Sequence, residues 1–106
     1  MPQTREEIRA ERKRLKARFR ELFEATAALF FRHDPIGIAF GSSDEYEPEV
    51  GTVLPRLCAC RSEADVCRVL HEEFVRWFGA DGAGSPEHYQ QVAIELWSLW
   101  RKFTAA

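Results

Sequence analysis

Several features that would reveal a chemistry are missing from this 106-residue sequence. No apolar run approaches the ~20 residues that cross a membrane, and the charged N-terminus lacks the apolar core of a secretory signal. We therefore expect a cytoplasmic protein. Glycine-rich phosphate loops, nucleophile elbows and His-Glu-x-x-His pairs are also missing. These absences argue against an enzyme, and we expect no catalytic residue and no cofactor.

Cysteine is scarce, with only Cys58, Cys60 and Cys67 in the chain. Their spacing is not the Cys-x-x-Cys of a zinc knuckle or a redox site. Three thiols, partly buried, are the simplest interpretation in a reducing compartment. A zinc site made of Cys60, Cys67 and His71 is an alternative, but it would need a fourth ligand. We expect no bound metal.

Charge is unevenly distributed along the chain, although the formal net charge is only −2. The first 20 residues carry a local charge of +5, which leaves −7 on the remainder. Part of this basic set falls on one helical stripe at steps of three and four residues, namely Arg5, Arg9, Arg12 and Lys16. Such a stripe can contact phosphates, so nucleic-acid binding is one hypothesis. Glutamates within the same segment also allow a solvated face with internal ion pairs.

Apolar spacing and capping signals predict helices. The first begins with the capping-box pattern of Thr4 and Glu7 and runs to about His33, where Asp34-Pro35 ends it. The second begins at Glu47-Pro48 and contains Pro55, which should kink it.

A third helix is predicted after the cap residue Ser62, with Gly79 as its stop. Residues 79–84 should form a flexible loop, and Ser85-Pro86 should start a fourth helix. The sequence therefore predicts an all-α fold, a small bundle of about four helices with a long N-terminal helix. Residues 1–106 should form a single domain, with residues 1–14 as a protruding charged helical arm. The expected core comprises Leu54, Leu57, Leu70, Phe74, Leu96 and Trp100.

The stretch between the first two helices is strongly acidic and contains Asp44, Glu45, Glu47 and Glu49. A calcium loop is not indicated, because the alternation is incomplete and no turn glycine lies among the acids. Acids near a helix N-terminus are favoured by the helix dipole, and Tyr46 should pack inward. Asp44, Glu45 and Glu49 can also form an exposed docking surface for a basic partner.

Two short motifs in this region resemble those of a known family. Asp34, Pro35 and Gly37 belong to a "DPIG" step, and Tyr46 belongs to a "DEY" acidic motif. Together they resemble a family of small bacterial proteins of unknown function, the YugE-like helical domain, over roughly residues 29–78. The resemblance implies a compact helical fold and supplies no catalytic or cofactor residue. Members of this kind resemble small immunity proteins of bacterial conflict systems.

Taken together, these patterns indicate a non-enzymatic protein-interaction module, with an immunity-like or adaptor role as its class. The partner-binding hypothesis rests on the acidic set, Asp44, Glu45 and Glu49, and on the basic set, Arg5, Arg9, Arg12 and Lys16. Self-association is a further option, with the basic helix of one copy against the acidic loop of another. A nucleic-acid-binding protein using the basic N-terminal helix is the alternative function.

Overall fold

The structure of this chain is a computed structural model. It describes residues 4–37 and 45–105, except for the side chains of Glu11, Arg12 and Leu15. Within these residues it contains four α-helices, two 3₁₀ helices and no strand, so the predicted all-α class is confirmed. No helix in this part of the chain is both long enough and apolar enough to span a membrane.

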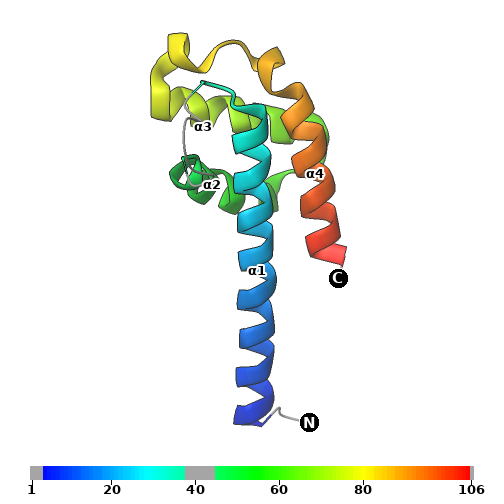
Figure 1. Cartoon of the computed structure of the whole chain (residues 1–106). Helices are drawn as coiled ribbons and strands as arrows, with labels where there is room; N and C mark the ends of the chain where they lie inside the picture. The colour runs from blue at the N-terminus through cyan, green and yellow to red at the C-terminus, as the bar shows by residue number, and fades with distance from the viewer. Residues whose placement is uncertain (1–3, 38–44, 106) are drawn as a thin grey trace.

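The elements follow one another as Figure 1 shows. α1 packs against α4 and α2, and α3 packs against both of them as well. The bounds are α1 Arg5–His33, α2 Glu47–Val53, η1 Leu54–Ala59, α3 Glu63–Ala83, η2 Pro86–Tyr89 and α4 Gln90–Ala105.

Side-chain chemistry accounts for both ends of α1. The Thr4 hydroxyl accepts a hydrogen bond from the Glu7 backbone N–H at 3.1 Å, which satisfies one of the free donors at the helix start. The predicted end is confirmed, because Asp34 leaves the helix in the left-handed region with φ 46°. Aspartate tolerates this conformation better than most residues.

The second helical segment begins at Glu47 with Pro48 in its first turn, as predicted. The predicted kink at Pro55 takes the form of a change of helix type. The α-helix ends at Val53, and the chain continues as η1 with Pro55 in its first turn. A proline nitrogen cannot donate to the carbonyl of Gly51, so the tighter 3₁₀ form replaces the α-helix there.

The Ser62 hydroxyl caps α3 by accepting from the Asp65 N–H at 3.2 Å, as predicted. Gly79 breaks the regular helix with φ 78°. The expectation of a flexible loop over residues 79–84 is wrong, because a further helical turn follows as far as Ala83. Ala83 is buried, and its carbonyl accepts a hydrogen bond from the Tyr89 hydroxyl.

The fourth helical segment starts differently from the prediction. Pro86 opens the 3₁₀ helix η2, and the α-helix begins only at Gln90. The expected cap is wrong, because the Ser85 side chain makes no capping hydrogen bond. The 3₁₀ turn instead brings Tyr89 into the core, where it is fully buried.

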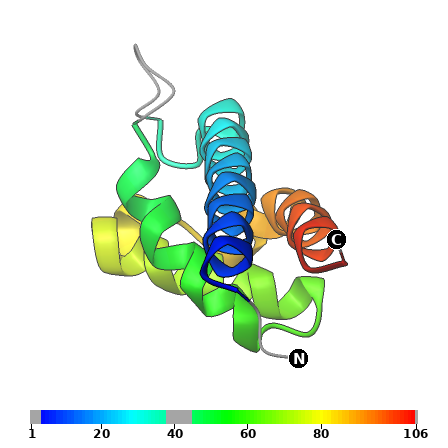
Figure 2. The same cartoon turned by 90° about the horizontal axis from the view of Figure 1, so that it is seen from below.

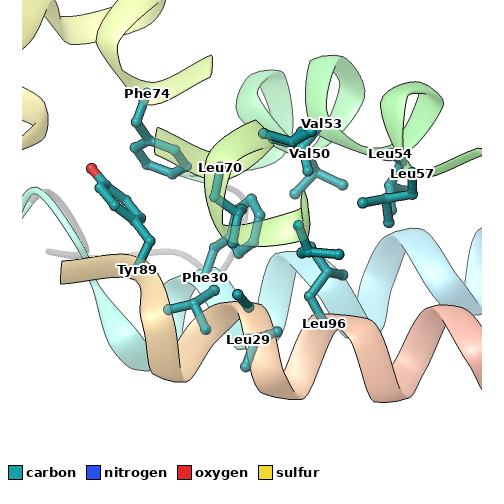
Figure 3. Close-up of a cluster of buried hydrophobic side chains, with 14 of the residues drawn as sticks. Leu29, Phe30, Val50, Val53, Leu54, Leu57, Leu70, Phe74, Tyr89 and Leu96 are labelled. Atoms are coloured by element: carbon teal, nitrogen blue, oxygen red, sulfur yellow. The ribbon is translucent and has the colours of Figure 1, made fainter. Parts of the chain in front are cut away.

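The core forms where all four α-helices meet. Phe74 lies at its centre, with ring centroids 5.7 Å from Phe30, 6.0 Å from Tyr46 and 5.2 Å from Tyr89. Figure 3 shows Phe30, Phe74 and Tyr89 converging from different elements. Five predicted core residues are confirmed as buried, namely Leu54, Leu57, Leu70, Phe74 and Leu96. Trp100 packs against this cluster but is only partly buried, so its predicted place in the core is confirmed in part.

The molecule is elongated, because α1 extends well beyond the other helices (Figure 1). The principal extents are 54 × 32 × 20 Å, and the radius of gyration is 15.5 Å. A compact chain of this length would have a radius of gyration of about 13 Å. Seen from below in Figure 2, α1 runs toward the viewer with α2 on one side and α4 on the other.

Candidate interaction surface on the first helix

A single apolar stripe runs along the whole of α1. Ile8, Leu15, Leu22 and Leu29 follow one another at intervals of seven residues, and Phe19 lies four residues after Leu15. Residues at these spacings share one helix face. The stripe therefore extends from the bundle into the N-terminal half of α1, residues 5–20, although Glu11 and Arg12 take the positions between Ile8 and Leu15 in the sequence.

The two halves of the stripe differ in exposure. Leu22 is 5% exposed and is the first buried side chain along the described part of α1. Below it, Phe19 is 48% exposed and Ile8 is 37% exposed. The same face that forms the core in one half of the helix is therefore open to solvent in the other.

Arg18 marks the boundary between the two halves. Its guanidinium donates a hydrogen bond to the Phe103 carbonyl and lies 5.0 Å from the centroid of the Phe103 ring. Within the described residues, α4 therefore contacts α1 as far as Arg18. The described side chains of α1 that precede Arg18 are all exposed.

A hollow of 680 Å³ adjoins the uncovered stripe. Phe19 and Phe23 form its apolar part, with ring centroids 6.4 Å apart. Its other lining residues are charged, namely Lys16, Arg20, Glu24 and Glu47. An apolar floor with a polar rim is the arrangement of a recognition surface.

The predicted basic residues lie on this half of α1. Arg5, Arg9 and Lys16 are exposed, and none of them forms an ion pair with another residue that the structure describes. The Arg12 side chain lies outside the described part. Among the described side chains, these three residues therefore form none of the internal ion pairs that the hypothesis of a solvated face requires.

The acidic set is not brought together as one surface. Asp44 lies outside the described residues, and Glu45 is exposed. The expectation that Glu49 faces solvent is wrong, because its side chain is only 4% exposed. Tyr46, Glu49, Val50 and Val53 fall at positions i, i+3, i+4 and i+7, so the register of α2 turns Glu49 inward with the apolar residues.

The Glu49 carboxylate is poorly compensated in this position. Its Oε2 atom has no hydrogen-bond partner within the described structure. Burial raises the pKa of this carboxyl group above its ordinary value. Because desolvation disfavours the charged form, Glu49 is a source of instability at neutral pH and cannot act as a docking residue.

The motif residues Asp34, Pro35, Gly37 and Tyr46 form a compact turn. The Tyr46 hydroxyl donates to Asp34 Oδ1 at 2.6 Å. The Gly37 N–H donates to the Asp34 carbonyl at 3.1 Å, with Gly37 at φ 73°. Pro35 offers its carbonyl to His88 Nε2 at 2.7 Å, which ties the turn to η2.

Cys67 and His71 line a groove of 480 Å³ between α3 and α4. The Cys67 thiol lies 3.3 Å from the Pro86 carbonyl oxygen, and His71 Nε2 lies 3.0 Å from that of Gly84. Burial raises the pKa of the Cys67 thiol, which makes it a weak nucleophile at neutral pH. No group of three metal-ligating side chains occurs within the described ranges, and the Cys60 thiol contacts the Arg56 carbonyl instead.

The exposure of Phe19 and two ion-pair clusters were not predicted. Each cluster contains a contact between residues that are far apart in the chain. Glu73 is buried and pairs with Arg56 at 2.9 Å and with its near neighbour Arg76 at 3.4 Å. Glu95 on α4 pairs with His33 and Arg32 at the end of α1. The seven-residue spacing from Ile8 to Leu29 is the signal in the sequence for the stripe, but spacing alone does not show which part of it is covered.

Comparison with protein-family models, curated proteins and solved structures finds no match.

Proposed function

We propose that this chain is a non-enzymatic, cytoplasmic protein-interaction module, and that it docks its partner on the N-terminal half of α1. One observation carries the proposal: the apolar stripe that builds the core continues into a part of α1 that no described residue covers. Exposed apolar residues framed by charged ones mark interaction sites. Phe19, with 48% of its surface exposed, is the expected anchor.

Projection of the helix supports this function. α1 extends beyond the bundle, and the molecule therefore measures 54 × 32 × 20 Å. The faces of the projecting part of α1 are accessible to another molecule. Holding Phe19 and Ile8 in water contributes nothing to stability, since burial is what stabilises apolar side chains. An adaptor or immunity-like role is the class of function consistent with such a surface.

Cross-linking from Phe19 tests the proposal. A photoreactive phenylalanine derivative is placed at position 19 in the full chain and irradiated in living cells of the source organism. The matched control is position 94 on α4, because Ile94 is 43% exposed and lies outside the surface. We expect a protein adduct at position 19 that is missing at position 94. Equal labelling at both positions, or none at 19, would contradict the proposal.

Nucleic acid is the second candidate, favoured by the exposed Arg5, Arg9 and Lys16. Phosphate contacts release counterions, so binding to random duplex DNA would weaken steeply with salt. In the cross-linking experiment this alternative predicts an adduct at position 19 whose added mass nuclease removes.

A further inference from the structure

We propose that the surface on the N-terminal half of α1 binds an acidic amphipathic helix of another protein. This inference rests on the proposed function and adds the chemistry of the partner. Its basis is the length of the exposed stripe, the charge of this half of α1 and the hollow beside Phe19.

The length of the exposed stripe indicates the shape of the partner. From Ile8 to Phe19 the stripe runs for about 16 Å at 1.5 Å per residue. A helix of three or more turns would cover this length and present its own apolar stripe to it.

Charge indicates the composition of the partner. The first 20 residues carry +5, and the exposed cations Arg9, Lys13 and Lys16 form one line on the same half of α1 as the stripe. An acidic helix would place carboxylates opposite these cations and speed encounter. The same segment of a second copy is equally basic, so pairing two copies along this stripe would oppose like charges.

The hollow supplies a site for an apolar anchor. Phe19 and Phe23 line it beside Lys16 and Arg20, and Glu24 and Glu47 complete the lining. A leucine or phenylalanine of the partner can enter it while carboxylates on the side of Lys16 and Arg20 meet these two cations. Nucleic acid would satisfy the cations but leave Ile8 and Phe19 without an apolar contact. An acidic amphipathic helix satisfies both parts of the surface.

Four probes test this chemistry on the full chain by fluorescence anisotropy. The first is a synthetic acidic peptide of about 20 residues, with leucines at helical spacing and glutamates elsewhere. The second has the same composition in scrambled order, the third has lysine in place of glutamate, and the fourth is a random DNA duplex. Binding is compared for the natural chain, for the double variant Ile8→Ser/Phe19→Ser and for the control Ile94→Ser, with circular dichroism as a check of folding.

We expect the acidic amphipathic peptide to bind the natural chain and Ile94→Ser equally. The double variant should bind this peptide roughly tenfold more weakly, because an interface anchor is lost. Added salt should weaken the binding of the peptide further. The scrambled and basic peptides should bind at least about tenfold more weakly than the first.

Three results would overturn the inference. The first is equal binding of the scrambled or basic peptide, or no binding of the first one. The second is a DNA duplex that binds more tightly than the peptide and binds the double variant as tightly as the natural chain. The third is a sedimentation experiment in which the natural chain alone is a dimer and the double variant is a monomer. A second copy of the chain would then occupy the surface. A protein adduct at position 19 together with any of these would refute the partner chemistry and leave the proposed function standing.

Discussion

The Tyr46 hydroxyl donates a hydrogen bond to Asp34 Oδ1 at 2.6 Å, and this contact joins the start of α2 to the end of α1. The Tyr46 ring is fully buried, with its edge toward Phe30 at a centroid distance of 6.3 Å. The Ile36 N–H also approaches the hydroxyl, at 3.4 Å. In the acidic stretch around the "DEY" motif, the tyrosine is therefore the member that organises the fold.

Replacing Tyr46 with phenylalanine should destabilise the chain by about 1–3 kcal/mol. The ring stays in place, but its hydrogen bond to the part-buried Asp34 carboxylate is lost, and a hydrogen bond to a charged group contributes about this much. Urea denaturation of Tyr46→Phe measures the change. The neighbouring control Glu45→Gln lies at an exposed position, and its stability should change by less than about 0.5 kcal/mol. Equal stability of the tyrosine variant and the natural chain would contradict this role.

Truncation of Phe74 to alanine should cost about 3–5 kcal/mol, because the side chain is fully buried at the meeting point of three other rings. The matched control is Phe19→Ala, which removes the same atoms from a side chain that is 48% exposed. Its loss should stay below about 1 kcal/mol. Thermal and urea unfolding of both variants measure the difference, and similar losses would mean that Phe19 is structural and not an interaction anchor.

Local chemistry explains which parts of the fold the sequence could predict. The caps at Thr4 and Ser62 and the end of α1 at Asp34 depend on neighbouring residues only, so they can be recognised in isolation. Most of the core followed from helical spacing for the same reason. The turn at Ala83 could not be foreseen, because it depends on the hydroxyl of Tyr89, which arrives from another element.

The candidate site was less predictable because it depends on tertiary cover. Spacing puts Ile8 and Leu29 on one stripe, but only the packing of the other helices against α1 decides which of them is exposed. The side of α2 that faces inward is likewise a tertiary property. The sequence allowed Glu45 and Glu49 to share a solvent-facing line, and packing instead placed Glu49 beside Val50 and Val53. A single carboxylate within an apolar face is the kind of local conflict that sequence patterns do not resolve.

Tyr89 should make the chain sensitive to alkaline pH. Burial raises the pKa of its phenol to about 12, whereas an unfolded tyrosine titrates near 10. The folded state holds this proton more tightly, so its contribution is complete below about pH 10 and is lost as the pH rises toward 12. Unfolding temperatures of the natural chain and Tyr89→Phe, measured between pH 8 and about pH 12, should show a steeper alkaline fall for the natural chain. Parallel curves would show that another group causes the fall.

Glu49 should have the opposite kind of effect, since its ionisation opposes folding at neutral pH. Burial raises the pKa of this carboxyl group, so the folded state binds the proton more tightly than the unfolded one. The resulting penalty is absent below the ordinary glutamate pKa of about 4.3 and grows as the pH rises above it. Glu49→Gln keeps the shape without the charge and should therefore be more stable than the natural chain at pH 7, by roughly 1 kcal/mol. The gain should fade as the pH approaches about 4.

Unfolding free energies of Glu49→Gln and the natural chain across this pH range measure the effect, with Glu45→Gln as the exposed control that should show no pH-dependent difference. The buried Oε2 atom without a described partner is the physical reason for expecting a gain and not a loss. If Glu49→Gln is instead less stable at pH 7 and matches the natural chain near pH 4, the ionised carboxylate makes a favourable interaction in solution. In that case Glu49 would stabilise the packing of α2 through its charge.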